Sequence, residues 1–182
     1  MTSLGSTLAI KMLSACPVDD SSLGVYSHRL GDLWLAGGAS NVGCAVLREE
    51  GFTTIELEEL SSGIDPAAEP PVAGYYPLPK ATVGERFPTN DPARIPVLEP
   101  VPDSRQEYLH SILHAIGRVE AQGYSALASL GASPLSRVYS CGGGANNSMW
   151  TRMRQFMLGV PVEVAPQTEA AVGVALLAVR GG

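Results

Sequence analysis

The sequence lacks any cluster of basic residues, and this absence is the first constraint on its function. It has 12 lysine and arginine residues against 18 aspartate and glutamate residues, which gives a net charge of −6. Proteins that bind nucleic acid or an anionic membrane do so largely through clustered cationic side chains. We therefore expect no nucleic-acid partner and no membrane partner.

Cysteine pairs, long apolar runs and targeting features are also lacking. Cys16, Cys44 and Cys141 form no Cys-x-x-Cys pair, so neither a disulfide framework nor a zinc site is predicted. No apolar run approaches the roughly 20 residues of a membrane-spanning helix. Residues 1–7 lack the charged and apolar regions of a signal peptide and the arginines of a transit peptide. A reducing, cytoplasmic compartment is the expectation.

Glycine and proline, in contrast, are abundant, with 20 and 14 of the 182 residues. The 45% of hydrophobic residues and 16% of charged residues are typical of one globular domain with a real core, residues 1–182. Ten prolines fall between Pro66 and Pro102. They exclude a continuous helix or central strand from the Pro-rich segment, residues 65–103. Its apolar residues favour a packed excursion over a flexible tether.

Hydrophobic periodicity predicts an α/β order along the chain, in which strands, glycine turns and helices alternate. The final helix is apolar and is expected to pack against the sheet as core. Strands are predicted at residues 8–13, 25–30, 33–36, 137–141 and 162–164. Helices are predicted from a cap at 40 or 41 to Gly51, from a cap at 53 or 54 through 60, from a cap at 103 or 104 to 130, and at 146–158 and 168–179.

Three strand ends carry glycine with small polar residues. We name them the Gly5 turn (residues 5–7), the Gly37 turn (residues 37–41) and the Gly142 turn (residues 142–147). Glycine lets a ligand approach the backbone closely, so three such turns could converge on one nucleotide. None has the lysine of a Walker A loop or the spacing of a dinucleotide-binding motif. The alternative is that these turns are ordinary strand–helix connections.

Several stretches resemble motifs of the FGGY family of carbohydrate kinases, which includes glycerol kinase, xylulokinase and ribulokinase. The most specific is residues 142–178, with Gly-Gly-Gly-Ala-Asn-Asn, Leu-Gly-Val-Pro and Thr-Glu-Ala-Ala motifs in order. Residues 3–7 resemble the family's second phosphate loop, and residues 35–40 its next nucleotide-contacting turn. Residues 84–94 resemble the loop before its long helix. The likeness covers nearly the whole chain and is greatest for the plant and cyanobacterial xylulokinase-like group that acts on ribulose.

The resemblance implies an actin-like ATPase (ribonuclease H-like) domain, with a mixed sheet flanked by helices and a Pro-rich insertion. It implies the nucleotide-binding half of a kinase that transfers the γ-phosphate of ATP to a sugar or polyol, with a ketopentose such as ribulose or xylulose favoured. Mg²⁺ is implied with ATP, bound mainly through phosphates and water. A homodimer, and a plastid location if the source is a plant, are further expectations.

The matching motif positions also imply ATP-binding residues. Those in the Gly5 turn would contact the phosphates, and the others would border the ribose or adenine, with the tryptophan closing the purine pocket. They are Gly5, Ser6, Thr7, Gly38, Gly143, Gly144, Asn147 and Trp150. For the tryptophan, a purely structural position in the core is the alternative.

The chain departs from the family pattern in ways that limit its predicted activity. Ser6 replaces the more usual threonine, the loop at residues 91–94 is a residue short, and His110 stands where many members have glutamate. The family's catalytic aspartate precedes the phosphate loop, whereas Asp19 and Asp20 follow it. We therefore expect no catalytic residue in this chain, which would be an inactive C-terminal fragment of a longer kinase.

Two other classes of function stay open. The chain could be a non-catalytic module that binds nucleotide weakly or binds only a partner chain, or a sugar-binding or structural domain. His110 and His114 have a metal-binding spacing, but without a third ligand two partly exposed helix histidines are favoured. Cys141 has no histidine or aspartate placed to activate it, so a small buried residue at a strand end is expected.

Overall fold

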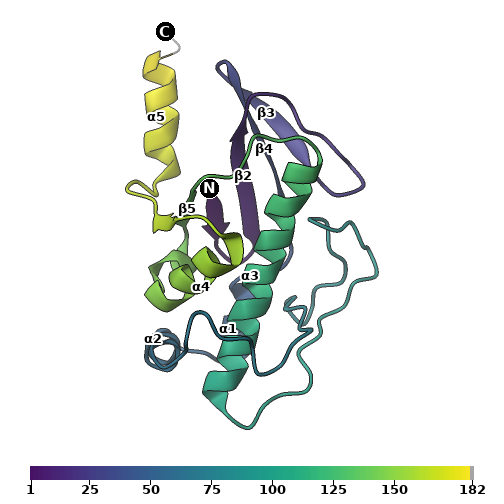
Figure 1. Ribbon diagram of the computed structural model, residues 1–182, viewed down its shortest axis with the longest axis vertical. Coiled ribbons are helices and arrows are strands. Elements are labelled where there is room, and N and C mark those ends of the chain that lie inside the picture. The colour runs from purple at the N-terminus through teal and green to yellow at the C-terminus, as the bar shows by residue number, and fades with distance from the viewer. Residues whose placement is uncertain (181–182) are drawn as a thin grey trace.

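A single mixed sheet organises the chain in a computed structural model that describes residues 1–180 (Figure 1). The strand order is β3-β4-β2-β1-β5-β6. Neighbours are antiparallel from β3 to β1, and β5 runs parallel to both β1 and β6. The strands are β1 (Thr2–Leu4), β2 (Leu8–Ser14), β3 (Tyr26–Leu30), β4 (Leu33–Ser40), β5 (Val138–Cys141) and β6 (Val162–Val164). The predicted α/β class is confirmed.

The helices differ widely in length, and α3 is the long one that runs across the sheet (Figure 1). None of them within residues 1–180 has the length and apolar character needed to cross a membrane. They are α1 (Ala45–Glu49), α2 (Thr54–Ser62), α3 (Arg105–Ser129), the short 3₁₀ helix η1 (Gly143–Asn146), α4 (Ser148–Leu158) and α5 (Ala170–Arg180).

The core lies between one face of the sheet and α3. Alternation along β2 turns Leu8, Ile10 and Met12 toward α3, whereas Lys11 and Leu13 lie on the other, more exposed face. The predicted apolar stripe of α3 is fully buried from Leu109 to Val119. Burying this stripe against the sheet fixes the helix, because apolar area removed from water is the main driving force of packing.

Two helix starts are confirmed at their predicted caps. Thr53 and Glu56 form a reciprocal capping box at α2, and the Ser104 side chain accepts a hydrogen bond from the Glu107 N–H at α3. Each cap satisfies a backbone N–H that the first helical turn leaves without an intrahelical partner.

The Pro-rich segment has no helix or regular strand, only isolated bridges, yet it packs against the core. Tyr75, Leu78 and Phe87 are each at most 1% exposed. The Phe87 ring lies so close to Gly123 of α3 that a Cβ there would meet it at 2.8 Å.

Two sequence predictions near Gly37 are wrong. The predicted strand at 33–36 continues through both glycines, and β4 ends only at Ser40 because residues 34–40 pair with β2. The following helix begins at Ala45 rather than after a cap at residue 40 or 41. The Ser40 hydroxyl and the Asn41 N–H instead donate hydrogen bonds to the Glu85 carboxylate, which holds the chain extended there.

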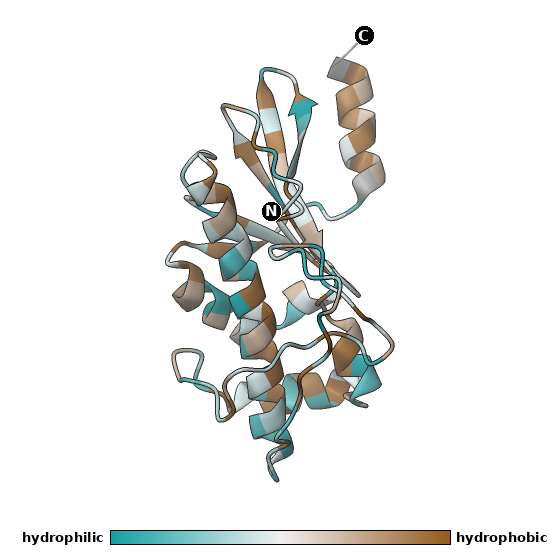
Figure 2. Cartoon of the chain, turned by 90° about the vertical axis from the view of Figure 1, so that its right-hand side faces the viewer, coloured by the Kyte–Doolittle hydropathy of each residue, from teal (hydrophilic) through white to brown (hydrophobic). Residues whose placement is uncertain are grey.

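Three further predictions concern burial and are also wrong. The final helix, α5, stands apart from the core (Figures 1 and 2), and its apolar residues from Val172 to Val179 are 39–82% exposed. His110, expected to be partly exposed, is only 7% exposed, because the Pro-rich segment at Ala68 lies beside its ring. Cys141, expected to be buried, is half-buried.

Candidate functional site

The Gly5 turn joins β1 to β2 and leaves two hydroxyl side chains accessible. Ser6 and Thr7 are both exposed. Two backbone hydrogen bonds join the turn to the start of α1. The N–H of Cys44 donates to the Gly5 carbonyl at 2.9 Å, and the N–H of Ala45 donates to the Ser6 carbonyl at 3.2 Å. The hydroxyls therefore lie on a turn whose backbone is fixed by a neighbouring element.

Gly43 makes this close approach possible. A Cβ at Gly43 would lie 2.5 Å from both the Ser6 carbonyl oxygen and the Thr7 Cα, so no other residue fits without displacing the Gly5 turn. The sequence analysis did not single out Gly43. Its place two residues after the predicted Gly37 turn is the signal that could have found it.

The Gly142 turn meets the Gly5 turn because β1 and β5 are parallel neighbours. Ser3 pairs with Cys141, so the chain leaves both strands at the same edge of the sheet. Gly142 has a φ of 85°, and a Cβ there would lie 2.6 Å from the Leu4 carbonyl oxygen. The two turns therefore touch through their backbones, as the convergence hypothesis requires.

The next two glycines have opposite surroundings. A Cβ on Gly144 would lie 2.6 Å from the Trp150 ring and 2.9 Å from the Cys44 sulfur, so this residue faces inward. A Cβ on Gly143 would meet nothing within 4 Å, and Gly143 is exposed. Gly143 thus presents open backbone to solvent beside the Gly5 turn.

Trp150 and Asn147 support the Gly142 turn from within. Trp150 is 1% exposed and its indole N–H donates to the Leu113 carbonyl at 3.0 Å, so in this chain it has a position in the core. The Asn147 side chain caps α4 by accepting from the Trp150 N–H, and its amide donates to the Ser61 hydroxyl of α2. Both side chains are therefore occupied by contacts within the protein.

Gly38 does not join the other predicted residues. It lies within β4, and a Cβ there would be 2.3 Å from the Phe87 ring, which covers it completely. The structure therefore brings together Gly5, Ser6, Thr7 and Gly143 at the surface, with Gly144 directly beneath.

A buried polar network that the sequence analysis missed fixes β1 against β5. The Arg154 guanidinium donates to both Glu120 carboxylate oxygens, at 2.6 and 2.7 Å, and to the Ser140 hydroxyl at 2.9 Å. The Thr2 hydroxyl donates to the same carboxylate at 2.5 Å. Arg154 and Glu120 are at most 1% exposed. Glu120 lies four residues after Ile116 on the buried stripe of α3, and an acid at that position is the signal that could have found it.

The groups exposed where the two turns meet are two hydroxyls, open backbone and one arginine. Burial raises the pKa of the Cys44 thiol to about 11, so it is a neutral side chain and no nucleophile at pH 7. Within residues 1–180 no group of three or more histidine, cysteine, aspartate or glutamate side chains could hold a metal ion. The exposed hydroxyls and the exposed guanidinium of Arg48, 3.0 Å from Ser6 Oγ, are suited to an anion.

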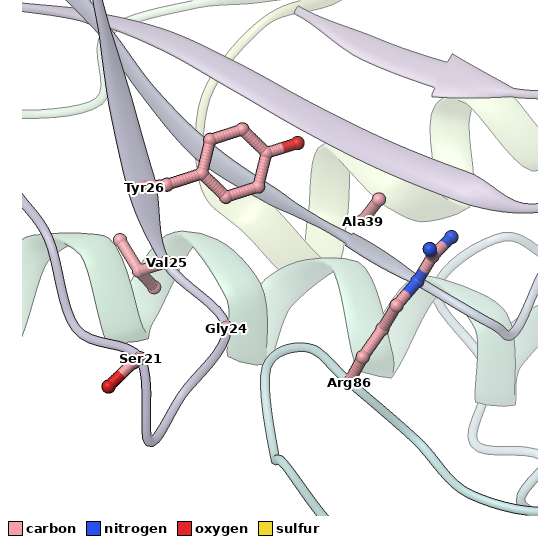
Figure 3. A pocket seen from close by; sticks show the side chains of 6 residues that line it. All are labelled: Ser21, Gly24, Val25, Tyr26, Ala39 and Arg86. Atoms are coloured by element: carbon pink, nitrogen blue, oxygen red, sulfur yellow. The ribbon is translucent and has the colours of Figure 1, made fainter.

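A separate cavity of about 360 Å³ opens beside β3 and β4 (Figure 3). The Tyr26 and Arg86 side chains extend into it from β3 and from the Pro-rich segment. Its lining is Ser21, Gly24, Val25, Tyr26, Ala39 and Arg86. None of these residues belongs to the Gly5 turn or the Gly142 turn, so the cavity is distinct from the site where the turns meet.

The fold and the paired glycine turns define an α/β domain with a mixed six-stranded sheet, in which two glycine turns meet at one edge. The chain belongs to the FGGY family of carbohydrate kinases, because the model of that family's C-terminal domain matches residues 2–181. The family resemblance in the sequence is thereby confirmed.

Solved structures show the same fold at low sequence identity. A xyloylose kinase from Brucella ovis and a xylulose kinase from Rhodospirillum rubrum, each 20% identical, superpose over 100% of this chain with TM-scores of 0.80 and 0.77. Plasmodium falciparum glycerol kinase, solved with ADP, is 15% identical over 97% of this chain, with a TM-score of 0.72. The chain spans 39%, 38% and 37% of these three proteins, about two fifths of their length.

Proposed function

We propose that this chain is the ATP-binding part of a carbohydrate kinase that transfers the γ-phosphate of ATP to a sugar or polyol hydroxyl. The observation that carries the proposal is the meeting of the Gly5 and Gly142 turns at one edge of the sheet, in a chain of the FGGY family. A glycerol kinase of the same fold has been solved with ADP, which supports a nucleotide at such a domain.

The two turns would divide the nucleotide between them. The Ser6 and Thr7 hydroxyls are exposed and can donate hydrogen bonds to phosphate oxygens. The Gly143 backbone is open on its outer side, so the ribose or adenine can approach where a side chain would block it. Mg²⁺ would be held mainly by the phosphates and water, as is usual for this ion. When bound, MgATP supplies the phosphoryl group.

The remaining parts of the reaction are assigned to a longer protein. The related kinases are about two and a half times the length of this chain. We place the catalytic aspartate and most of the sugar site in that additional length, and we expect this chain alone to be inactive because phosphoryl transfer needs both substrates positioned together. A ketopentose such as ribulose or xylulose is the favoured substrate, and three free cysteines fit a reducing cytoplasmic setting.

Gly143→Val in the full-length protein tests the nucleotide site. A Cβ there meets no atom within 4 Å, so the fold should persist while the valine side chain occupies the space in front of the turn. We expect the dissociation constant for MgATP, measured by titration calorimetry, to rise about tenfold or more. The matched control is Gly173→Val on α5, which is equally open and lies outside both turns. Equal affinities in all three proteins would contradict the proposal.

A second candidate is a non-catalytic module that binds nucleotide or a partner chain, including a second copy of itself. The exposed apolar surface of α5 favours it, because large apolar patches commonly mark contact sites. A phosphorylation screen of the full-length protein with ketopentoses, aldoses and polyols separates the two. Nucleotide binding without transfer to any of these substrates would favour the module.

A further inference from the structure

Arg48 is an exposed cation held beside the Gly5 turn. It is the fourth residue of α1, and its Nη2 donates to the Ser6 hydroxyl oxygen at 3.0 Å. No carboxylate among residues 1–180 lies within ion-pairing distance of its guanidinium. The two acids that follow it are engaged with Lys80, Glu49 through the backbone N–H and Glu50 through the ammonium group.

The position of Arg48 is set by contacts that leave its charge free. The backbone N–H groups of Cys44 and Ala45 are used by the carbonyls of the Gly5 turn, and Gly43 packs directly under Thr7. These contacts fix α1 relative to the turn. Arg48 is then the unpaired positive group at the place where the exposed hydroxyls lie.

We propose that Arg48 binds the phosphate chain of the nucleotide together with Ser6 and Thr7, an inference that rests on the proposed function. A guanidinium has five N–H donors in a planar fork, and the bond to Ser6 uses one of them. Ser6 accepts that bond, which leaves its own hydroxyl proton free for a phosphate oxygen. Because the chain has a net charge of −6, a local cation also offsets general repulsion of a polyphosphate.

A purely structural role for Arg48 predicts a different pattern of binding. If Arg48 only held the Ser6 side chain, Arg48→Gln, which keeps a hydrogen-bond donor, would bind MgATP nearly as the unchanged protein does, and only Arg48→Ala would lose affinity. If it contacts phosphate, the loss must grow with the number of phosphates and must vanish for adenosine. Arg48→Gln separates these roles because glutamine can still donate a hydrogen bond to Ser6 but carries no charge.

The test is calorimetric titration of the full-length protein with MgATP, MgADP, AMP and adenosine. For Arg48→Ala and Arg48→Gln we expect MgATP to bind about tenfold to a hundredfold more weakly, AMP less affected, and adenosine within twofold of the unchanged protein. Arg48→Lys should retain part of the MgATP affinity. Thermal melting of each variant shows that the fold is kept.

Arg29→Ala is the matched control for loss of one positive charge. Arg29 pairs with Trp34, which pairs with Ser14, so it lies at the opposite end of β2 from the Gly5 turn. This variant should bind MgATP as the unchanged protein does. Equal losses for all four ligands, no loss in Arg48→Ala, or full MgATP affinity in Arg48→Gln would overturn the role of Arg48 while leaving nucleotide binding intact. Failure of the unchanged protein to bind any of the ligands would overturn the proposed function as well.

Discussion

The Pro-rich segment and α5 are opposites in regularity and in burial. The Pro-rich segment has no helix or regular strand, yet Tyr75, Leu78 and Phe87 lie in the core. Helix α5 is regular and strongly apolar, yet its side chains from Val172 to Val179 are exposed. Regular backbone hydrogen bonding and burial are therefore separate properties, and only contacts with the rest of the fold decide the second.

The difference arises from what each segment can contact. The Pro-rich segment precedes α3 and returns along it, so its apolar side chains reach both α3 and the sheet, and its Glu85 carboxylate accepts a hydrogen bond from the Ser40 hydroxyl of β4. Helix α5 follows the edge strand β6. Within residues 1–180, α5 lies beyond the edge of the sheet, and its large apolar side chains are exposed (Figure 1).

Phe87→Ala should lower the free energy of unfolding most, and it tests whether the Pro-rich segment is part of the core. The Phe87 ring is fully buried, and it fills the space in front of Gly38 and Gly123. Removing it leaves a cavity between β4 and α3, so we expect the free energy of unfolding to fall by about 3–5 kcal/mol. Urea denaturation monitored by circular dichroism measures this. A loss below about 1 kcal/mol would mean that the Pro-rich segment is not part of the core.

Glu85→Ala should have the next largest effect. The Glu85 carboxylate accepts hydrogen bonds from the Ser40 hydroxyl, the Asn41 N–H and the Tyr76 hydroxyl, and the residue is 2% exposed. Its removal leaves buried donors without partners, which costs on the order of 1–3 kcal/mol. Glu85→Gln is the control, because it keeps the shape and two acceptor lone pairs and should lose less stability in the same urea measurement.

Local signals in the sequence were sufficient for most elements but not for their environment. The caps at Thr53 and Ser104 and the apolar stripe on α3 depend only on residues close together in the sequence, so they could be predicted. The position of Gly38 could not, because a ring from the Pro-rich segment, 49 residues further along the chain, decides what faces it. The exposure of α5 could not either, since apolar periodicity says which face seeks burial and not whether a surface is available.

The residues of the candidate site also fall into those that local motifs could predict and those that depend on distant contacts. Family motifs pointed to Gly5, Ser6, Thr7 and Gly143, which the structure brings together at the surface. Arg48 and the Arg154–Glu120 pair were missed because their roles depend on contacts between residues 34 or more positions apart. For Trp150 the sequence left a ligand contact and a core position both open, because an apolar residue near a glycine turn is compatible with either, and in this chain the side chain is buried.

Lowering the pH should loosen the packing of the Pro-rich segment on α3. The resulting loss of stability should be smaller than that of Phe87→Ala or Glu85→Ala. Burial lowers the pKa of both His110 and His114, so folding favours their neutral forms. Their contribution to stability is complete above the unfolded value of about 6.5 and is lost as the pH falls below it. We expect the urea midpoint to decrease from pH 7.5 to pH 5.5. The His110→Gln, His114→Gln double variant should lose most of this dependence, and an unchanged slope would exclude these histidines as its cause.

Substitutions on α5 should change the free energy of unfolding least, and they test whether this helix is exposed. Val174 and Leu177 are 66% and 55% exposed, so replacing either by serine removes little buried apolar area. We expect each change to alter the free energy of unfolding of this chain by less than about 0.5 kcal/mol, far below Phe87→Ala. The same two substitutions in the longer protein test whether another part of that protein covers α5. If a further domain covers α5 there, the loss should grow above about 1 kcal/mol per residue, whereas equal small values in both proteins would mean that the helix stays uncovered.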